Sequence, residues 1–368
     1  MSRSRAPYAV QLGSLQTFSA SADLDPFDLT KLPARHRLLG ILLEFRALID
    51  TGVTTSHVLR DNFKLLTDLN MQDATGGFRP LTGVHLVDLY DTLVLMLGAR
   101  SRQFATSTLP ISSTNAVRQI GFYIPFADLR LKKATDTAWP TDIFRSGGLF
   151  TGKWNSATLG GITGDDIGGT TVKPWAIVQP VDSKIVAPVG ACYRKVQRGA
   201  TLDAPLPPGA FSDIWCRFAT EAALEATGTA RLLLDGAQHG PQVDQLSHRI
   251  IQLGSNGHIM NGLATDTELE TPAIQFAMAL AASPRENAQL SWRPKAVERA
   301  TVEFFDGTAA AFDVLLHYST PYTQAYEEAV KAATGAVGQG IIDTLDGGGV
   351  DTTNPDVFFL PRKFLMAP

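Results

Sequence analysis

The chain has 368 residues, a formal net charge of −4 at pH 7 and a hydrophobic fraction of 44%. This apolar content is enough for a buried core and excludes a disordered chain. The negative charge balance argues against bulk nucleic-acid binding, which needs a strong positive field. Charged residues make up only 18%, against about 25% in a typical globular domain. The low charge content indicates that part of the surface is buried against other subunits.

Neither a membrane span nor a secretory signal is expected. No stretch reaches the roughly 18 consecutive apolar residues of a spanning helix. The start of the chain, MSRSRAPYAV, has no long apolar run after its arginines. The two cysteines, Cys192 and Cys216, are too few for a disulfide scaffold and are interpreted as buried thiols. We therefore expect a soluble protein made in a reducing cytoplasm.

Short apolar segments alternate with glycine and proline along most of the chain. The predicted strands are Leu38–Ile49, Phe63–Leu69, Gln119–Phe126, Trp175–Val181, Ile185–Val196, Ile214–Ala219, Ala230–Leu234, Ala273–Leu280, Val297–Phe305 and Phe312–Tyr318. In Leu38–Ile49, polar Glu44 and Arg46 show the alternation of a half-buried strand. Many short strands separated by turn residues predict an all-β sandwich or barrel.

Three helices are predicted from apolar residues at three- and four-residue spacing or from helix-forming composition. They are Leu86–Leu97, Val243–Leu253 and Pro321–Thr334, the last ending at Gly335. Beyond Gly335, a Gly/Asp/Thr segment leads to an aromatic terminus. We interpret it as an arm whose phenylalanines need a partner surface, with folding back onto its own domain as the alternative.

The two halves of the chain repeat one order of elements. In the first half, LLGILLEFRALI is followed by a polar loop, FKLLTDLN, a Gly/Pro-containing link and the helix Leu86–Leu97. In the second half, Phe211–Ala222 is followed by ARLLLDGA, a link with Gly240-Pro241, and the helix Val243–Leu253. Repeated supersecondary order is hard to obtain by chance, so the pattern predicts a duplicated β-sandwich.

The motif search identifies no catalytic, cofactor-binding or metal-ligating residue. The segment Gly147–Lys153 matches part of a phosphate loop, but Trp154 stands where a Ser or Thr should ligate magnesium. Asp165 and Asp166 lie in a glycine-rich loop, where adjacent carboxylates are more often solvated than bound to calcium. The seven histidines form no H-E-x-x-H motif and no C-x-x-C occurs. We therefore expect a protein that is not an enzyme and holds no cofactor.

Two longer segments carry a family resemblance. LPARHRLLGILLEFRALIDTG, followed by DNFKLLTDLNMQDATGGFRPLTGVHLVDLYDTL, resembles the opening of the double jelly-roll major capsid proteins. These belong to tailless icosahedral viruses that enclose a membrane, the tectivirus- and corticovirus-like lineage. AVRQIGFYIPFADLRLKKATDTAWPTDIF resembles the middle strand of the first domain and its loop. The resemblance covers about Leu32 to Tyr318.

The resemblance implies an all-β fold of two tandem eight-stranded jelly rolls with a few short helices. It also implies a structural protein of the virion, such as a bacteriophage coat, made in the host cytoplasm. Three chains would form a homotrimeric, pseudo-hexagonal capsomer of an icosahedral shell. The implied partners are other copies of the chain and neighbouring capsomers, with minor capsid proteins and an internal membrane as further candidates. Sequence-specific nucleic-acid binding is not implied.

The expected division of the chain follows from these patterns. The first jelly roll is placed at 14–183, the second at 184–320, and the helix with the C-terminal arm at 321–368. The boundary falls near Gln179–Pro188, where two prolines bracket an Asp-Ser pair. The loops Gly98–Asn115 and Gly147–Lys173 are expected at the capsomer surface, where insertions are tolerated.

Other functions remain open at this point. A carbohydrate-active or carbohydrate-binding β-sandwich would use the five tryptophans as sugar platforms: Trp139, Trp154, Trp175, Trp215 and Trp292. Four of these lie in or beside predicted strands, which favours a place in the core. A bicupin enzyme would need clustered histidine ligands, and His85, His239 and His317 lack that spacing. A different structural or receptor-binding virion protein is the remaining alternative.

Overall fold

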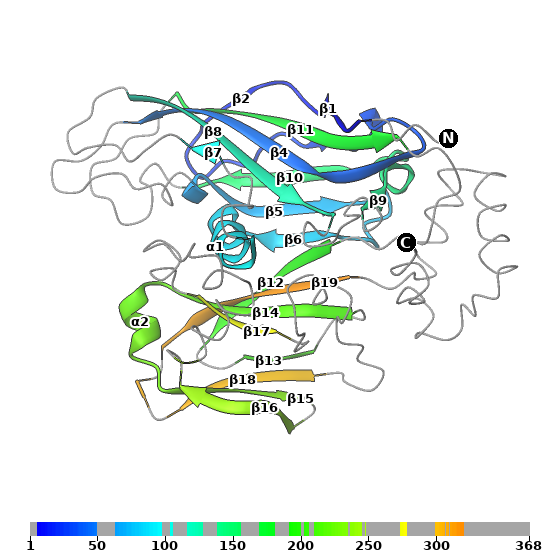
Figure 1. Cartoon of the computed structure of the whole chain (residues 1–368). Coiled ribbons are helices and arrows are strands. Elements are labelled where there is room, and N and C mark those ends of the chain that lie inside the picture. Colours follow the sequence, from blue (N-terminus) through cyan, green and yellow to red (C-terminus); the bar gives the residue numbers. More distant parts are fainter. Residues whose placement is uncertain are drawn as a thin grey trace, which may run out of the picture.

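The computed structural model consists almost entirely of β-strands arranged in three sheets (Figure 1). The residues that it describes are 6–49, 63–97, 104–105, 116–127, 138–155, 169–180, 191–199, 202–205, 210–234, 236–244, 247, 273–277, 299–305, 307–308 and 310–319. All statements of structure below refer to these residues.

The first sheet has seven strands and uses only residues before 181. Its main order is β1-β11-β4-β8-β7, with β2 paired to β11 and β9 paired to β4. The strands are β1 (Tyr8–Gln11), β2 (Gln16–Thr17), β4 (His36–Ile49), β7 (Phe104–Ala105), β8 (Ala116–Pro125), β9 (Trp139–Pro140) and β11 (Thr171–Pro180). In β4, Ile41, Leu43 and Phe45 are buried, whereas Glu44 and Arg46 are exposed. Successive side chains of a strand point to opposite faces, so this alternation buries one face of the sheet.

The second sheet has eight strands and runs through both halves of the chain. Its order is β17-β14-β19-β12-β6-β5-β10-β3. The strands are β3 (Phe27–Asp28), β5 (Leu66–Gln72), β6 (Leu81–Val84), β10 (Leu149–Trp154), β12 (Ala191–Gly199), β14 (Ala210–Phe218), β17 (Ala273–Ala277) and β19 (Phe312–Ser319). The halves meet at a parallel pair, β6 with β12. This long sheet therefore belongs to two sandwiches at once.

The third sheet has four strands and uses only residues of the second half. Its order is β13-β18-β15-β16, formed by β13 (Leu202–Pro205), β15 (Thr229–Leu234), β16 (Ala237–Asp244) and β18 (Arg299–Phe305). Phe218 of β14 contacts Phe304 of β18 with ring centroids 5.2 Å apart, and Phe304 contacts Phe312 at 5.1 Å. These aromatic contacts join the third sheet to the β12-β19-β14-β17 part of the shared sheet.

The first sandwich packs the seven-stranded sheet on the β6-β5-β10-β3 part of the shared sheet. Phe122 of β8 contacts Phe63 beside β5 at 5.1 Å, and Phe150 and Trp154 of β10 are buried in the same core. One continuous set of buried side chains extends from this core into the second sandwich. The two sandwiches therefore stand side by side on one shared sheet and share one core.

Besides two short 3-10 helices, Leu29–Lys31 and Thr141–Ile143, two α-helices have defined bounds in the described ranges. The predicted helix Leu86–Leu97 is confirmed with the same bounds as α1, which lies between the strands of the two sandwiches (Figure 1). The short helix α2 (Glu221–Glu225) begins after Thr220, whose side chain accepts a hydrogen bond from the Ala223 amide. Within the described ranges, neither helix has the length and apolar character of a membrane span.

The predicted strands are confirmed with shifted ends, and one predicted helix, Val243–Leu253, is wrong at its first two residues, although Ser247 is helical. Val243 and Asp244, the expected start of the helix Val243–Leu253, belong to β16 and pair with Ala230 and Thr229 of β15. Pro241 lies inside the same strand, which proline tolerates because β16 is at the edge of its sheet. Pairing with a neighbouring strand therefore outweighs the local helical spacing.

The segment Gly147–Lys173, expected as a surface loop, is partly core. It contains β10, whose Phe150 and Trp154 are buried, and the first residues of β11. Most of the segment Gly147–Lys153, which matches part of a phosphate loop, is thus a β-strand. A strand lacks the helix N-terminus that a phosphate loop needs, so the interpretation of this segment as no phosphate loop is confirmed. Several expectations lie outside the described residues: the domain boundary at 183/184, the helix Pro321–Thr334, the C-terminal arm and most of the loop Gly98–Asn115.

Candidate functional site at the junction of the two sandwiches

The junction between the sandwiches is a short backbone contact. Tyr193 and Arg194 of β12 lie opposite Leu81 and Thr82 of β6 in parallel register. The Tyr193 amide donates to the carbonyl of Pro80 at 2.8 Å. The buried Tyr193 hydroxyl donates to the carbonyl of Pro125, at the end of β8, at 2.9 Å. We call this β6–β12 contact the seam. Through Tyr193 alone, the second sandwich contacts both sheets of the first.

Beside the seam, helix α1 places two buried carboxylates against an arginine of the second sandwich. Asp88 and Asp91 are three positions apart, so they share one face of the helix. Arg217 of β14 contacts Asp88 Oδ1 through Nη1 at 2.9 Å and donates from Nε to Asp91 Oδ2 at 2.6 Å. Asp91 is fully buried and Asp88 is 2% exposed. The guanidinium therefore bridges the two sandwiches through charges removed from water.

Lys195 of β12 extends the same cluster toward the solvent. Its ammonium lies 3.0 Å from Asp88 Oδ2 and 3.1 Å from Asp313 Oδ2 of β19. It also lies 3.0 Å from Nδ1 of His85, the residue that precedes α1. Asp68 of β5 lies 3.4 Å from the other ring nitrogen of His85. The junction cluster, defined as these residues with Asp88, Asp91 and Arg217, thus joins β5, α1, β12, β14 and β19.

The charges of the junction cluster stabilise one another. Burial alone lowers the pKa of Arg217, but the nearby carboxylates of Asp91 and Asp88 outweigh this and raise it. Arg217 therefore stays charged, and its partners depend on that charge. A buried ion pair adds little net stability, yet losing one partner leaves an uncompensated buried charge. We therefore expect the cluster mainly to specify how the two sandwiches meet.

The sequence carried a signal for this cluster that the motif search did not use. Asp88 and Asp91 interrupt the apolar helix LVDLYDTLVLML at positions where apolar residues would otherwise pack. Carboxylates on the buried face of a helix need cationic partners. Their partners could not be found from local patterns, because Arg217 is 126 positions from Asp91.

Other residues singled out from the sequence have structural places. Cys192 and Cys216 are buried free thiols, as predicted, and burial raises the pKa of Cys216 well above its usual value. Among the described residues, no group of three or more His, Cys, Asp and Glu side chains is arranged to hold a metal ion. His85 lies at the junction, whereas His239 and His317 belong to β16 and β19. Asp165 and Asp166 lie outside the described residues.

The tryptophans that were candidate sugar platforms are mostly core residues. Trp139, Trp154 and Trp215 are each at most 2% exposed. Trp175 is half-buried on the outer face of the first sheet, where its indole N–H donates to Glu44 at 2.9 Å. The Lys173 ammonium lies 4.4 Å from the Trp175 ring centroid. Trp292 lies outside the described residues.

No family model and no curated protein matches the chain. Comparison with solved structures finds proteins of similar fold. The major capsid protein of Sulfolobus turreted icosahedral virus aligns over 85% of this chain and 96% of its own, with a TM-score of 0.58 and 11% identity. The major capsid protein P2 of bacteriophage PM2 aligns over 87% and 99%, with a TM-score of 0.54 and 12% identity. The fold is a double jelly roll.

A third match extends the likeness to a further virus. A chain of the PBCV-1 virus capsid aligns over 87% of this chain and 95% of its own, with a TM-score of 0.55 and 12% identity. The predicted fold class is therefore confirmed for both halves. In this double jelly roll, the junction cluster lies where the first jelly roll meets the second.

We expect Arg217→Met to lower the free energy of unfolding by about 3–5 kcal/mol, because it leaves Asp88 and Asp91 buried without their cation. The matched control is Arg231→Met, which removes a cross-strand partner of Glu303 on the outer face of the third sheet. That pair is about one third exposed, so its loss should cost about 0.2–1 kcal/mol. Equilibrium urea denaturation measures both values, and equal losses would contradict a special role for the junction.

Proposed function

We propose that the chain is the major capsid protein of an icosahedral virion, and that its role is structural and not enzymatic. The observation that carries this proposal is the extent of the structural likeness. The compared capsid chains are covered over 95–99% of their length, and this chain over 85–87%. The likeness therefore includes both jelly rolls and the junction between them.

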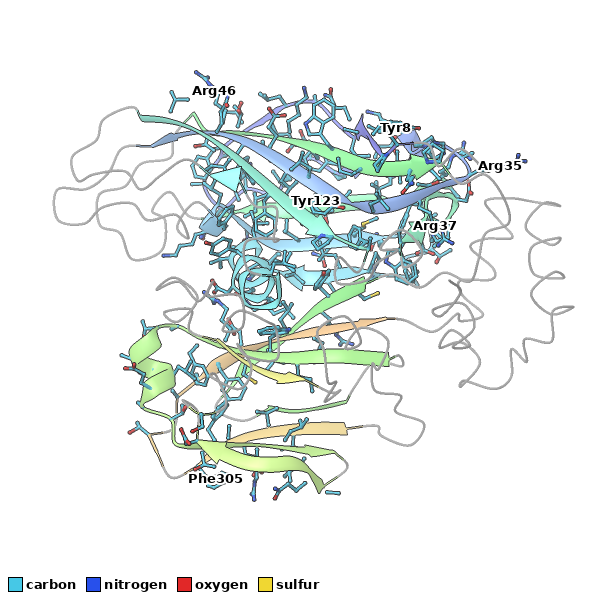
Figure 2. The ribbon with its side chains drawn as sticks, in the orientation of Figure 1. Tyr8, Arg35, Arg37, Arg46, Tyr123 and Phe305 are labelled. Carbon is cyan, nitrogen blue, oxygen red and sulfur yellow. The ribbon has the colours of Figure 1, made fainter. Side chains whose placement is uncertain are left out.

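The same proposal includes a homotrimeric, pseudo-hexagonal capsomer. One chain presents two sandwiches, which we place on either side of the proposed boundary at 183/184, with β1 (Tyr8–Gln11) as part of the first, so three chains present six lobes. Contacts between different flanks of neighbouring copies form a closed ring when the rotation between them is threefold. The outer faces of the first and third sheets, marked by Arg46 and Phe305, lie at opposite ends of the folded molecule (Figure 2). These separate faces supply two different flanks for such contacts.

A carbohydrate-binding β-sandwich is the second candidate, and the geometry favours it less. Sugar platforms need exposed aromatic faces, whereas three of the five tryptophans are core residues. Trp175 is the one half-buried tryptophan in the described ranges, and its ring is already in contact with Lys173 and Glu44.

Light scattering coupled to size-exclusion chromatography tests the proposed assembly. We expect a particle with three times the 39.6 kDa mass of one chain, and negative-stain images with six lobes. Arrays or shells should appear at high protein concentration. A stable monomer that binds a glycan array would contradict the capsid proposal and support the carbohydrate-binding alternative.

The C-terminal arm, at 335–368, is proposed to stabilise assembly. Its Val357, Phe358, Phe359 and Leu360 form an apolar group, and burying one such aromatic side chain contributes about 1.5–3 kcal/mol. Deleting Gly347–Pro368 should leave both sandwiches folded, as judged by circular dichroism. Trimers or shells of the truncated chain should need a higher protein concentration to form than those of the full chain. Unchanged assembly, or a failure of the truncated chain to fold, would contradict this role.

One end of the first sandwich supports the proposal that the shell faces an anionic membrane on its inner side. Three turns converge there: 29–35, 73–79 and 141–148. Their exposed charged side chains are Lys31, Arg35, Arg79 and Arg145, all basic. Figure 2 shows Arg35 pointing away from the ribbon at this end. We call these four residues the basic end.

Both acidic residues of these turns are buried, and one of them, Asp142, pairs with Arg145 at 3.5 Å. Asp73 and Asp142 are 1% and 4% exposed. Asp73 accepts hydrogen bonds from the Phe78 amide and the Thr75 hydroxyl. Asp142 accepts from the Arg35 amide at 3.2 Å, which holds Arg35 in a left-handed conformation with φ 56°. The basic end therefore stands out on a chain whose net charge is −4.

We expect the protein to co-sediment with vesicles that contain phosphatidylglycerol but not with purely zwitterionic vesicles. Each exposed basic residue contributes about 1 kcal/mol near an anionic surface. The triple variant Arg35→Ser/Arg79→Ser/Arg145→Ser should therefore weaken binding on the order of a hundredfold. The control Arg46→Ser/Arg194→Ser/Arg231→Ser changes the net charge equally at other places. Equal losses in the two variants, or binding to duplex DNA and not to vesicles, would overturn this orientation.

A further inference from the structure

His85 of the junction cluster lies at the meeting point of three elements. It directly precedes α1, and its ring faces Asp68 on β5, Asp88 on α1 and Lys195 on β12. Asp68 has a left-handed backbone, φ 50°, in an irregular part of β5, a conformation uncommon for residues other than glycine. The His85 side chain is 32% exposed, so protons from solvent reach it although Asp88 and Lys195 are largely buried.

The contacts of His85 define where its proton lies. An ammonium group can only donate hydrogen bonds, so Nδ1, which lies 3.0 Å from Lys195 Nζ, must be the acceptor. The proton of the neutral ring is then on Nε2, facing Asp68 Oδ1 at 3.4 Å. His85 is therefore neutral in this arrangement, with both ring nitrogens directed at charged groups.

A second proton on the ring is incompatible with this arrangement. It would place an N–H and a positive charge at Nδ1, directed at the Lys195 ammonium 3.0 Å away. Lys195 has another acceptor, because Asp313 lies 3.1 Å from its ammonium. The new N–H also has an acceptor nearby, because Asp88 Oδ2 lies 3.9 Å from Nδ1. Each group displaced by the proton thus has a partner to move to.

Asp88 is able to accept this new partner. Its oxygens contact Arg217 and Lys195 at ion-pair distance, but neither oxygen accepts an aligned hydrogen bond. The four carboxylates of the cluster, on Asp68, Asp88, Asp91 and Asp313, exceed the two permanent cations, Lys195 and Arg217. A third positive charge on His85 therefore fits the charge balance of the cluster as a whole.

We propose that His85 is a proton-operated switch of the contact between the two jelly rolls. In the neutral state, Asp88 pairs with Lys195 across the junction. Protonated His85 takes Asp88 for itself, within the first jelly roll, and Lys195 keeps its existing partner Asp313, within the second. The exchange removes the Lys195–Asp88 bridge between the jelly rolls and adds a His85–Asp88 pair inside the first, so the β6–β12 seam loosens as the pH falls while Arg217 still holds Asp88 and Asp91. Protonation of His85 and the Lys195–Asp88 pair are therefore linked, and each disfavours the other.

The switch is a property of the single chain and does not depend on the capsid proposal. Its failure would leave the fold and the assembly proposal unaffected.

Hydrogen–deuterium exchange of the full chain at pH 7.5 and pH 5.5, corrected for the intrinsic pH dependence of exchange, tests the switch. Peptides covering Leu81–Val84 and Ala191–Lys195 should lose protection by about tenfold or more at pH 5.5, the effect of one lost charge-assisted contact. Peptides covering the paired strands β4 and β11 of the first sheet, far from the junction, should keep their protection.

Three variants separate the switch from a general effect of acid. His85→Gln cannot gain a charge, so the seam should be equally protected at both pH values. His36→Gln is the matched control, because the His36 side chain bonds the Tyr8 hydroxyl and the Ala34 carbonyl, both in the first sandwich. This variant should retain the wild-type response. Lys195→Met removes the bridge itself, so its seam should be weakly protected at both pH values.

The proposal is overturned by any of three results. The wild-type seam could keep its protection at pH 5.5, or His85→Gln could lose protection as the wild type does. In the third case, the loss at pH 5.5 would be uniform over all three sheets, which is acid unfolding and not a local opening. If His85→Gln does not fold, Lys195→Met decides, because a remaining tenfold pH response in that variant contradicts the exchange of partners.

Discussion

The arrangement of the whole chain depends on a small contact between β6 and β12 and on the charges buried beside it. Two register pairs of parallel strand are too few to fix the orientation of two large sandwiches. Asp88, Asp91 and Arg217 add the missing specificity, because a buried charge is tolerated only where its partner lies within ion-pair distance. An apolar junction would allow many nearby packings, whereas these charges match in one.

This junction explains how one chain presents two lobes as a single unit. The shared eight-stranded sheet passes through both sandwiches, and one continuous core lies along it. In Figure 1 the first sheet lies at the top, the third sheet lies at the bottom, and the shared sheet lies between them. Their outer faces are therefore held at a fixed separation, which is what a subunit needs if neighbours are to contact both in a closed ring.

The charge distribution gives the proposed shell a direction. The chain is negative overall, and its low charge content suits extensive contacts between subunits. The basic end departs from this average because Asp73 and Asp142 are buried and bind backbone amides, while four basic side chains of the same turns lie at the surface, one of which, Arg145, pairs with Asp142. The polarity thus follows from hydrogen bonding within three turns and not from a run of basic residues in the sequence.

The sequence by itself determined the elements whose signal is local. The alternation in β4 and the helical spacing in Leu86–Leu97 repeat within a few residues, so both were predicted, as were the buried thiols. Val243 and Asp244 carried a helical spacing, but pairing with β15 decided their conformation. The junction cluster was decided only by the tertiary structure. Its members come from five elements, and one contact, between Asp88 and Arg217, joins residues 129 positions apart (217 − 88). Ion pairs between distant residues leave no periodic pattern in a sequence.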